Sequence, residues 1–222
     1  YGPAEILFGV SLKLARGEVA ALMGRNGAGK STTLKAIMGL LPPRAGQVRF
    51  AGQEISGMPA FRIARLGLGY VPEDRRIFTD LTVAENLEVG RRAARGHAAW
   101  TPERLFEIFP NLAAMRGRRA AAMSGGEQQM LAIARTLMGN PDAVLLDEPS
   151  EGLAPVILEL MAEAVLSMKR EGIAVLLSEQ NFDFAAAVAD RAYVIERGEI
   201  RYDGSMAALE ADPALRAQHL TL

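Results

Sequence analysis

The chain has 222 residues, 50% of them hydrophobic, and 25 basic side chains against 26 acidic ones. This size allows one large domain or two small lobes around a sizeable core. The balanced charge argues against a nucleic-acid partner, and the absence of cysteine excludes disulfides and thiolate metal sites. The longest apolar runs, AVLL and IAVLL, are far too short to cross a membrane. Because the sequence begins with Tyr1 instead of methionine, we expect the native N-terminus to lie upstream.

The first third of the chain alternates apolar runs with helical spacing. Residues 17–24 predict a buried strand, and residues 31–41 predict a helix that ends at two prolines. A short strand with a turn is expected over 46–53, and a second buried strand over 67–73. From about residue 82 to 123 the pattern becomes purely helical.

The remaining segments continue the alternation. Helices are expected at 101–110, 126–139, 154–171 and 182–189 and after Ser205, strands at 142–149 and 172–179, and a hairpin at 191–204 that turns at Arg197 and Gly198. The sequence therefore predicts an α/β fold with a mainly parallel sheet covered on both faces and a small antiparallel part. We expect a single domain over 1–222, with a core lobe of about 1–72 and 140–222 and an inserted helical lobe of about 73–139.

A glycine-rich loop joins the first strand to the first helix. Residues 24–31 match G-x-x-x-x-G-K-[ST], the pattern of a phosphate-binding loop. Its glycines let successive N–H groups point at one anion, and the helix adds its positive end. That dipole is worth only about 0.3–2 kcal/mol, so Lys30 is needed on the β- and γ-phosphates and Ser31 on Mg²⁺.

An acidic pair follows the strand AVLL. Asp147 stands where a second magnesium partner is needed and would hold Mg²⁺ through water. Glu148 would polarise the attacking water. Such a pair alone is most often a solvated turn, but beside a phosphate loop the functional interpretation, a magnesium partner and a group that polarises water, is favoured.

The segment MSGGEQQMLAIAR, residues 123–135, resembles the signature of ATP-binding-cassette (ABC) ATPases. The resemblance covers nearly the whole chain and implies a phosphate-loop core with an inserted signature lobe. In that family the signature faces the γ-phosphate held by another subunit, so it implies a pair of ATPase chains, identical or different. It also implies separate transmembrane permease subunits, because this chain shows no membrane span.

The resemblance assigns the site residue by residue. ATP contacts are expected at Tyr1, Gly24, Arg25, Asn26, Gly27, Ala28, Gly29, Lys30, Ser31 and Thr32 and, from the partner chain, at Ser124, Gly125, Gly126 and Glu127. Mg²⁺ is expected at Ser31, Asp147 and Glu73, while Glu148 acts as base and Gln180 senses the γ-phosphate. If Tyr1 is the adenine-stacking aromatic, the usual first strand is missing.

Further segments resemble one branch of the family. YVPEDRRIF, SGGEQQM, EPSEGLAP and SEQN look like the smaller ATPase subunit of the high-affinity branched-chain amino acid importer. Such a subunit works at the cytoplasmic face of the inner membrane and depends indirectly on a periplasmic solute-binding protein. Asp74 and Glu151 differ from residues frequent in that branch and leave the solute open. We also expect Phe78, with Ile77 and Leu81, to form a docking groove or else an ordinary core cluster.

Other functions stay open at this point. Related urea or short-chain amide importers, and importers of other amino acids, share these motifs. Soluble cassette ATPases that act on DNA or in iron–sulfur assembly are alternatives, as is a regulator that binds nucleotide without hydrolysing it. The short span from Lys30 to Ser124 lacks the coiled coils of the DNA-acting class, and Glu148 argues against the inactive one.

Overall fold

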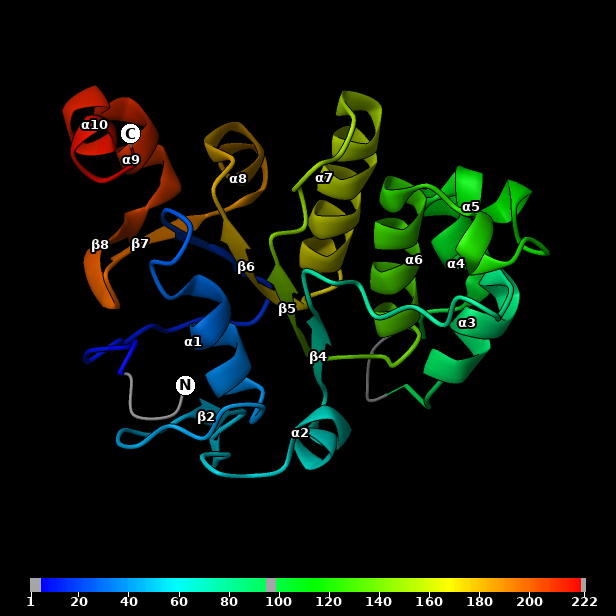
Figure 1. Cartoon of the computed structure of the whole chain (residues 1–222), viewed down its shortest axis with the longest axis horizontal. Helices are drawn as coiled ribbons and strands as arrows, with labels where there is room; N and C mark the ends of the chain where they lie inside the picture. Colours follow the sequence, from blue (N-terminus) through cyan, green and yellow to red (C-terminus); the bar gives the residue numbers. More distant parts are fainter. Residues whose placement is uncertain (1–4, 95–98, 221–222) are drawn as a thin grey trace.

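One six-stranded sheet forms the centre of the molecule. The computed structural model describes residues 5–94 and 99–220. The strands lie in the order β4-β5-β6-β1-β7-β8 (Figure 1), parallel except for the antiparallel pair β7 and β8. Their bounds are Val19–Met23 (β1), Leu68–Val71 (β4), Ala143–Asp147 (β5), Ala174–Glu179 (β6), Arg191–Glu196 (β7) and Glu199–Ser205 (β8).

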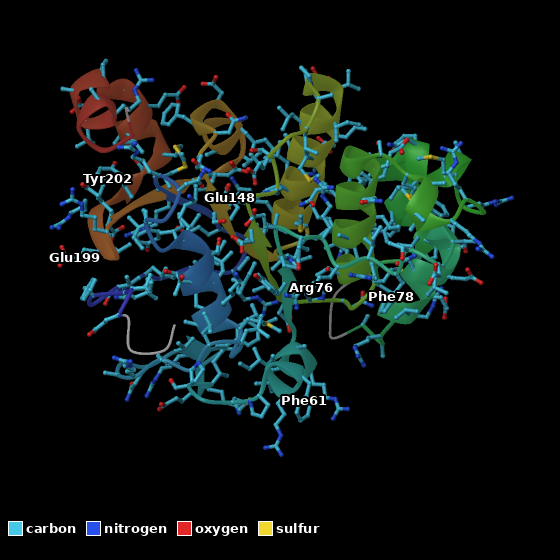
Figure 2. All side chains as sticks on the ribbon, in the orientation of Figure 1. Phe61, Arg76, Phe78, Glu148, Glu199 and Tyr202 are labelled. Atoms are coloured by element: carbon cyan, nitrogen blue, oxygen red, sulfur yellow. The ribbon has the colours of Figure 1, made fainter. Side chains whose placement is uncertain are left out.

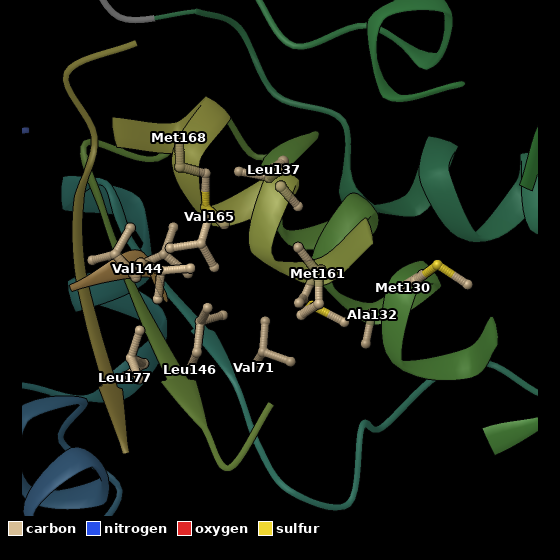
Figure 3. Packing of buried hydrophobic residues seen from close by; sticks show 14 of the residues in the cluster. Val71, Met130, Ala132, Leu137, Val144, Leu146, Met161, Val165, Met168 and Leu177 are labelled. Atoms are coloured by element: carbon tan, nitrogen blue, oxygen red, sulfur yellow. The ribbon is translucent and has the colours of Figure 1, made fainter. Parts of the chain in front are cut away.

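Each face of this sheet carries its own hydrophobic core. Along β1, Ala21 and Met23 belong to one cluster and Ala20 and Leu22 to the other, as the two-residue period of a strand requires. Because both faces are covered, the central strands read as unbroken apolar runs. Figure 3 shows the first cluster, in which Val144 and Leu146 of the sheet lie near Met161, Val165 and Met168.

The second cluster is covered by the N-terminal part of the chain. Helix α1 lies in front of the sheet in Figure 1, and α2 lies below it beside a small two-stranded sheet. Leu34 of α1 and Ile63 of α2 are fully buried in this cluster. The elements are α1 (Lys30–Ile37), β2 (Arg49–Phe50), β3 (Gln53–Glu54) and α2 (Ala60–Leu66).

A group of helices lies at one end of the sheet, on the right in Figure 1. It contains α3 (Val83–Gly90), α4 (Pro102–Ile108), α5 (Pro110–Ala114), a 3₁₀ turn (Ala120–Ala122) and α6 (Gly125–Leu137). Helix α6 contacts both α3 and β4, so it joins this group to the sheet. Trp100 and Phe109 are buried within the group. The boundaries of a helical lobe at 73 and 139 stay a prediction.

Helices of the C-terminal half help to cover the sheet face that carries the first hydrophobic cluster. Helices α7 (Pro155–Arg170), α8 (Phe182–Val188), α9 (Met206–Ala211) and α10 (Pro213–Leu220) stand along the upper side of Figure 1. Among residues 5–94 and 99–220, no helix combines the length and hydropathy that crossing a membrane requires.

The predicted α/β class is confirmed, and most elements lie within a few residues of their predicted bounds. The turn at Arg197 and Gly198 has two positive φ angles, +49° and +82°, as a tight hairpin requires. Helix α2 was missed. It is a short helix that begins after Pro59 and ends at Gly67, and its stretch carries no strong apolar period.

Candidate active site

Five parallel strands deliver their carboxyl ends to one edge of the sheet, where a cavity of about 450 Å³ lies. Loops after parallel strands meet at this edge, which is where open α/β sheets bind ligands. Its lining residues come from the loops after β1, β4 and β5, from α1 and from the N-terminal segment: Ile6, Asn26, Gly27, Gly29, Lys30, Ser31, Thr32, Glu73, Glu148 and Glu151. In Figure 2, Glu148 lies near the middle of the molecule.

The phosphate-binding loop turns tightly against β7. A β-carbon at Gly24 would lie 2.4 Å from the carbonyl oxygen of Ile195, so only glycine fits there. Gly29 precedes α1 with φ +113°, a left-handed conformation that glycine adopts without strain. The first N–H groups of α1 therefore open into the cavity with no side-chain cap, as an anion site requires.

Lys30 is the buried cation of this loop, with 3% of its surface exposed. Its Nζ donates to the carbonyl oxygens of Gly24 (2.8 Å) and Arg25 (3.1 Å). The same Nζ lies 3.1 Å from Oε1 of Glu148. A phosphate group entering the cavity can take over these contacts, because all of them are made at the tip of one flexible side chain.

Ser31, which lines the cavity, contacts the buried Asp147 behind it. The Ser31 hydroxyl donates to Oδ1 of Asp147 at 2.8 Å, and Asp147 is 1% exposed. Oxygen ligands of this kind suit Mg²⁺, which keeps several waters and shares phosphate oxygens. No group of three or more His, Cys, Asp or Glu side chains within the described residues could hold a metal by itself. The pair therefore fits a magnesium ion that arrives with its nucleotide.

Glu73 follows β4 and lies at the cavity rim. Its pKa is raised, first by desolvation and then by the negative charges of Glu151, Glu148 and Asp147. The side chain lines both this cavity and a neighbouring depression next to Gln128. Glu73 thus lies among the acidic side chains of the cavity, and its role as a magnesium ligand stays a prediction.

Glu148 and Gln180 are brought into direct contact. Gln180 Nε2 donates to Oε2 of Glu148 (2.9 Å) and to Oδ1 of Asn26 (2.7 Å). Glu148 has a positive φ of +47°, which for a residue with a side chain indicates a backbone held by its surroundings. Its N–H donates to the hydroxyl of Ser178 (3.0 Å) and to the carbonyl oxygen of the same residue (3.1 Å).

The signature segment lies apart from this cavity. Ser124 is the N-cap of α6, and a capping box joins it to Glu127: the Ser124 hydroxyl accepts from Glu127 N–H, and the Glu127 carboxylate accepts from Ser124 N–H. Neither Ser124, Gly125, Gly126 nor Glu127 lines the cavity that contains Lys30. Within one chain, therefore, the structure brings the phosphate loop, Asp147, Glu148 and Gln180 together and leaves the signature outside.

Comparison with known proteins identifies this arrangement. Residues 7–151 match the family model described as "ABC transporter". The chain is 43% identical to the high-affinity branched-chain amino acid transport ATP-binding protein BraG of Pseudomonas aeruginosa, over 99% of this chain and 95% of that protein.

The chain belongs to the ABC transporter ATPase family.

Other members of the family match over similar lengths. The probable branched-chain amino acid transport ATP-binding protein LivF of Archaeoglobus fulgidus is 34% identical, over 92% of this chain and 88% of that protein. The lipopolysaccharide export ATP-binding protein LptB of Escherichia coli is 31% identical, over 99% and 92%. The structure of "the ADP conformation of MJ1267, an ATP-binding cassette of an ABC transporter" superposes with a TM-score of 0.80 at 27% identity, over 97% of this chain and 92% of that one. This ABC ATPase accordingly binds and hydrolyses ATP.

The other residues predicted to contact ATP fall into three groups: outside the described residues, lining the cavity, or behind it. Tyr1 lies outside the described residues, so its stacking role stays a prediction. Asn26, Gly27, Gly29 and Thr32 line the cavity, whereas Gly24, Arg25 and Ala28 shape the loop behind it.

The sequence reasoning missed residues that support the site of this ABC ATPase from behind. Ser178 Oγ (2.7 Å) and Tyr70 Oη (3.2 Å) both donate to the Asp147 carboxylate. Burial, and then Asp147 itself, raises the pKa of Tyr70, which keeps that hydroxyl protonated as a donor. The sequence signal that could have revealed Tyr70 and Ser178 is their place on the predicted strands that became β4 and β6, the two neighbours of β5.

Glu179 is a third residue that the sequence did not reveal. It ends β6, is 2% exposed, and accepts from Ser150. Burial raises its pKa to about 6. Because this value lies above the ordinary one, the folded protein binds the proton more tightly than the unfolded chain, and that stabilisation is lost as the pH rises through about 6.

Proposed function

We propose that this ABC ATPase powers the import of branched-chain amino acids through separate membrane subunits. The observation that carries the proposal is the identity of 43% to BraG over nearly the full length of both chains, against 31% for the export ATPase LptB. Import of urea, short-chain amides or other amino acids is the alternative, since the solute is chosen by other chains. The protein works at the cytoplasmic face of the inner membrane, bound to its permease.

Purification from membranes tests this assignment. A tagged chain extracted in mild detergent should co-purify with two permease subunits, and its ATPase rate in proteoliposomes should rise when leucine and a periplasmic binding protein are added. Extraction of the ATPase without any permease subunit, or a complex stimulated by urea but not by leucine, would contradict the assignment.

The proposal includes a second ATPase chain, identical or related, that completes each site. One phosphate loop and one signature exist per chain, and Ser124 lies outside the Lys30 cavity. The N-terminus of α6, a helix of 13 residues, carries N–H groups without intrahelical partners and does not line the chain's own nucleotide cavity. The signature of one chain therefore closes on the nucleotide of the other, so that two ATP molecules are enclosed between two chains.

We propose a task in hydrolysis for each of these residues. Lys30 exchanges Glu148 and the loop carbonyls for phosphate oxygens when ATP enters. Ser31 and Asp147, with Glu73 at the rim, would hold Mg²⁺, which supplies charge neutralisation on the phosphates when bound. Once Lys30 has left it, the Glu148 carboxylate accepts a hydrogen bond from the attacking water and takes its proton. Gln180 holds that carboxylate in place.

A pH prediction follows from Gln180. Its amide does not titrate, so kcat should stay flat from about pH 6.5 to 8, whereas Gln180→His should introduce an ionisation near an unperturbed pKa of about 6.5. Gln180→Ala removes the contact to Glu148 and should lower kcat about 10-fold or more while leaving the affinity for ATP nearly unchanged. Rate profiles of the three proteins with saturating Mg-ATP measure this. An alanine variant at full speed would remove Gln180 from the mechanism.

We further propose that Phe78 contacts a cytoplasmic helix of the permease. Ile77 packs against the core, but Phe78 is 48% exposed. The backbone of Phe78 is fixed on both sides, because its N–H donates to Asn86 Oδ1 and its carbonyl accepts from Asn86 Nδ2. Arg135 of the signature helix lies over the ring, 5.0 Å from its centre. An apolar group held rigidly in solvent beside the signature helix suits a helix-in-groove contact.

Phe78→Ala should therefore reduce transport severalfold and leave basal ATP hydrolysis and binding unchanged. Phe61→Ala is the matched control, because Phe61 is also exposed (57%) and also lies beside arginines, yet stands well away from Phe78 in Figure 2. Uptake and basal ATPase rates of both variants measure the effect. Equal uptake by the two variants would contradict the docking role.

A further inference from the structure

The carboxylate of Glu179 joins two segments that carry the proposed catalytic residues. Its Oε1 accepts from the N–H of Ser150 at 3.0 Å, and its Oε2 accepts from the hydroxyl of Ser150 at 2.8 Å. Oε2 also accepts from the N–H groups of Gln180 and Asn181, both at 3.2 Å. Four donors thus converge on one carboxylate that is 2% exposed. No ion pair with Glu179 is found among the described residues, so these donors alone satisfy the buried charge.

The first segment is the turn that follows β5. Glu148 enters this turn with φ +47° and is fixed on its amino side, where its N–H donates to the carbonyl oxygen and the hydroxyl of Ser178. Ser150 stands two residues later and is fixed by Glu179. Neighbouring residues 178 and 179 of β6 therefore hold the turn before and after Glu148, and the strained conformation is over-determined by its surroundings.

The second segment is the turn after β6. Gln180 is fixed at both its main chain and its side chain. Its N–H donates to Glu179, and its side-chain amide donates to Asn26 and Glu148. The path from Ser150 through Glu179 to Gln180 closes a ring of contacts around Glu148. Removing the carboxylate would free both ends of this ring at once.

We propose that Glu179 is a positioning residue for ATP hydrolysis, which holds the Glu148 turn and the Gln180 backbone as one rigid unit. The inference rests on the proposed roles of Glu148 and Gln180. Glu179 itself is 2% exposed and does not line the cavity, so it acts through its neighbours. Its contribution should appear in kcat and hardly in the affinity for ATP, because Lys30 and the phosphate loop lie on other elements.

Glu179→Gln tests the proposal because it keeps the shape and replaces one acceptor oxygen with an NH₂ group. That group cannot accept from the N–H donors that meet there. We expect kcat to fall about 10- to 100-fold, with KM within about threefold of the wild-type value. Hydrogen exchange of the Ser150, Gln180 and Asn181 amides should become about tenfold faster or more. Glu179→Asp, which keeps the charge and both oxygens, should recover part of kcat.

The matched control is Glu85→Gln. Glu85 Oε2 likewise accepts from a backbone N–H and a hydroxyl, those of Thr82, but it lies on the exposed cap of α3. This variant should leave kcat and the three amides unchanged. If Glu179→Gln does not fold, Ser150→Ala tests the proposal instead, because it deletes only the hydrogen bond from the Ser150 hydroxyl to Glu179. This variant should lower kcat about three- to tenfold at unchanged KM.

Two results would overturn the proposal. One is a wild-type kcat in Glu179→Gln, or in Ser150→Ala where the first does not fold. The other is unchanged exchange at the three amides. Glu148→Gln and Gln180→Ala, measured in parallel, distinguish failure of this proposal from failure of the proposed catalytic roles. Full activity in those two variants would reject the catalytic roles of Glu148 and Gln180. Faster amide exchange in Glu179→Gln would still show that Glu179 holds the two turns together.

Discussion

Replacing Glu148 with glutamine is expected to lower kcat for ATP hydrolysis by about 100- to 10,000-fold, the usual contribution of a general base. The amide keeps the shape of the side chain and cannot take a proton from water. It also removes a negative charge that lies 3.1 Å from Lys30 and competes with phosphate for that cation. The affinity for ATP should therefore be equal to or tighter than that of the wild type, and the two-chain complex should persist with ATP bound.

Single-turnover hydrolysis, equilibrium ATP binding and size-exclusion chromatography with Mg-ATP measure these effects. Glu199→Gln is the control, a surface carboxylate on the hairpin at the far left of Figure 2, and it should behave as the wild type. Hydrolysis at the wild-type rate by Glu148→Gln would show that another group acts as the base.

Lys30→Ala is expected to weaken the binding of ATP. A charge-assisted hydrogen bond contributes about 1.5–3 kcal/mol, which corresponds to a loss of about 10- to 150-fold in affinity for ATP. The substitution also leaves the Glu148 carboxylate, which is 9% exposed in the side chain, without its cation. Repulsion between this carboxylate and the γ-phosphate adds to the loss.

Titration with a fluorescent ATP analogue measures this affinity, and thermal unfolding without nucleotide checks the fold. Lys13→Ala, which removes an exposed lysine remote from the cavity, should bind the analogue normally. Binding by Lys30→Ala within twofold of the wild type would exclude Lys30 as a phosphate ligand.

The parts of the site that the sequence predicted are those encoded in short contiguous motifs. The loop that ends in Lys30 and the acidic pair after β5 each combine a recognisable spacing with a strand end. Parallel strands bring such ends to one edge, so the meeting of Ser31 with Asp147 could be expected before any coordinates. Gln180 follows β6 and so lies at the same edge, where its side chain contacts Glu148; its role at the γ-phosphate came from the family resemblance and stays a prediction.

What the sequence could not predict depends on strand order and on turns. β4, β5 and β6 are neighbours in the sheet but are separated by long stretches of chain, so the bonds of Tyr70 and Ser178 to Asp147 have no local pattern. Two of the four donors on Glu179 belong to Ser150, 29 residues earlier in the chain, and the other two to Gln180 and Asn181, which follow it. Helix α2 was missed because its seven residues are too few to show a period.

Uptake of labelled leucine tests the central proposal most directly. Cells that make this chain with its own permease would carry either the wild-type protein, Glu148→Gln or Lys30→Ala at equal abundance. We expect uptake of leucine, isoleucine and valine to be lost in both variants and uptake of urea to be unchanged. Normal uptake of all three amino acids in cells whose ATPase carries Glu148→Gln would contradict it.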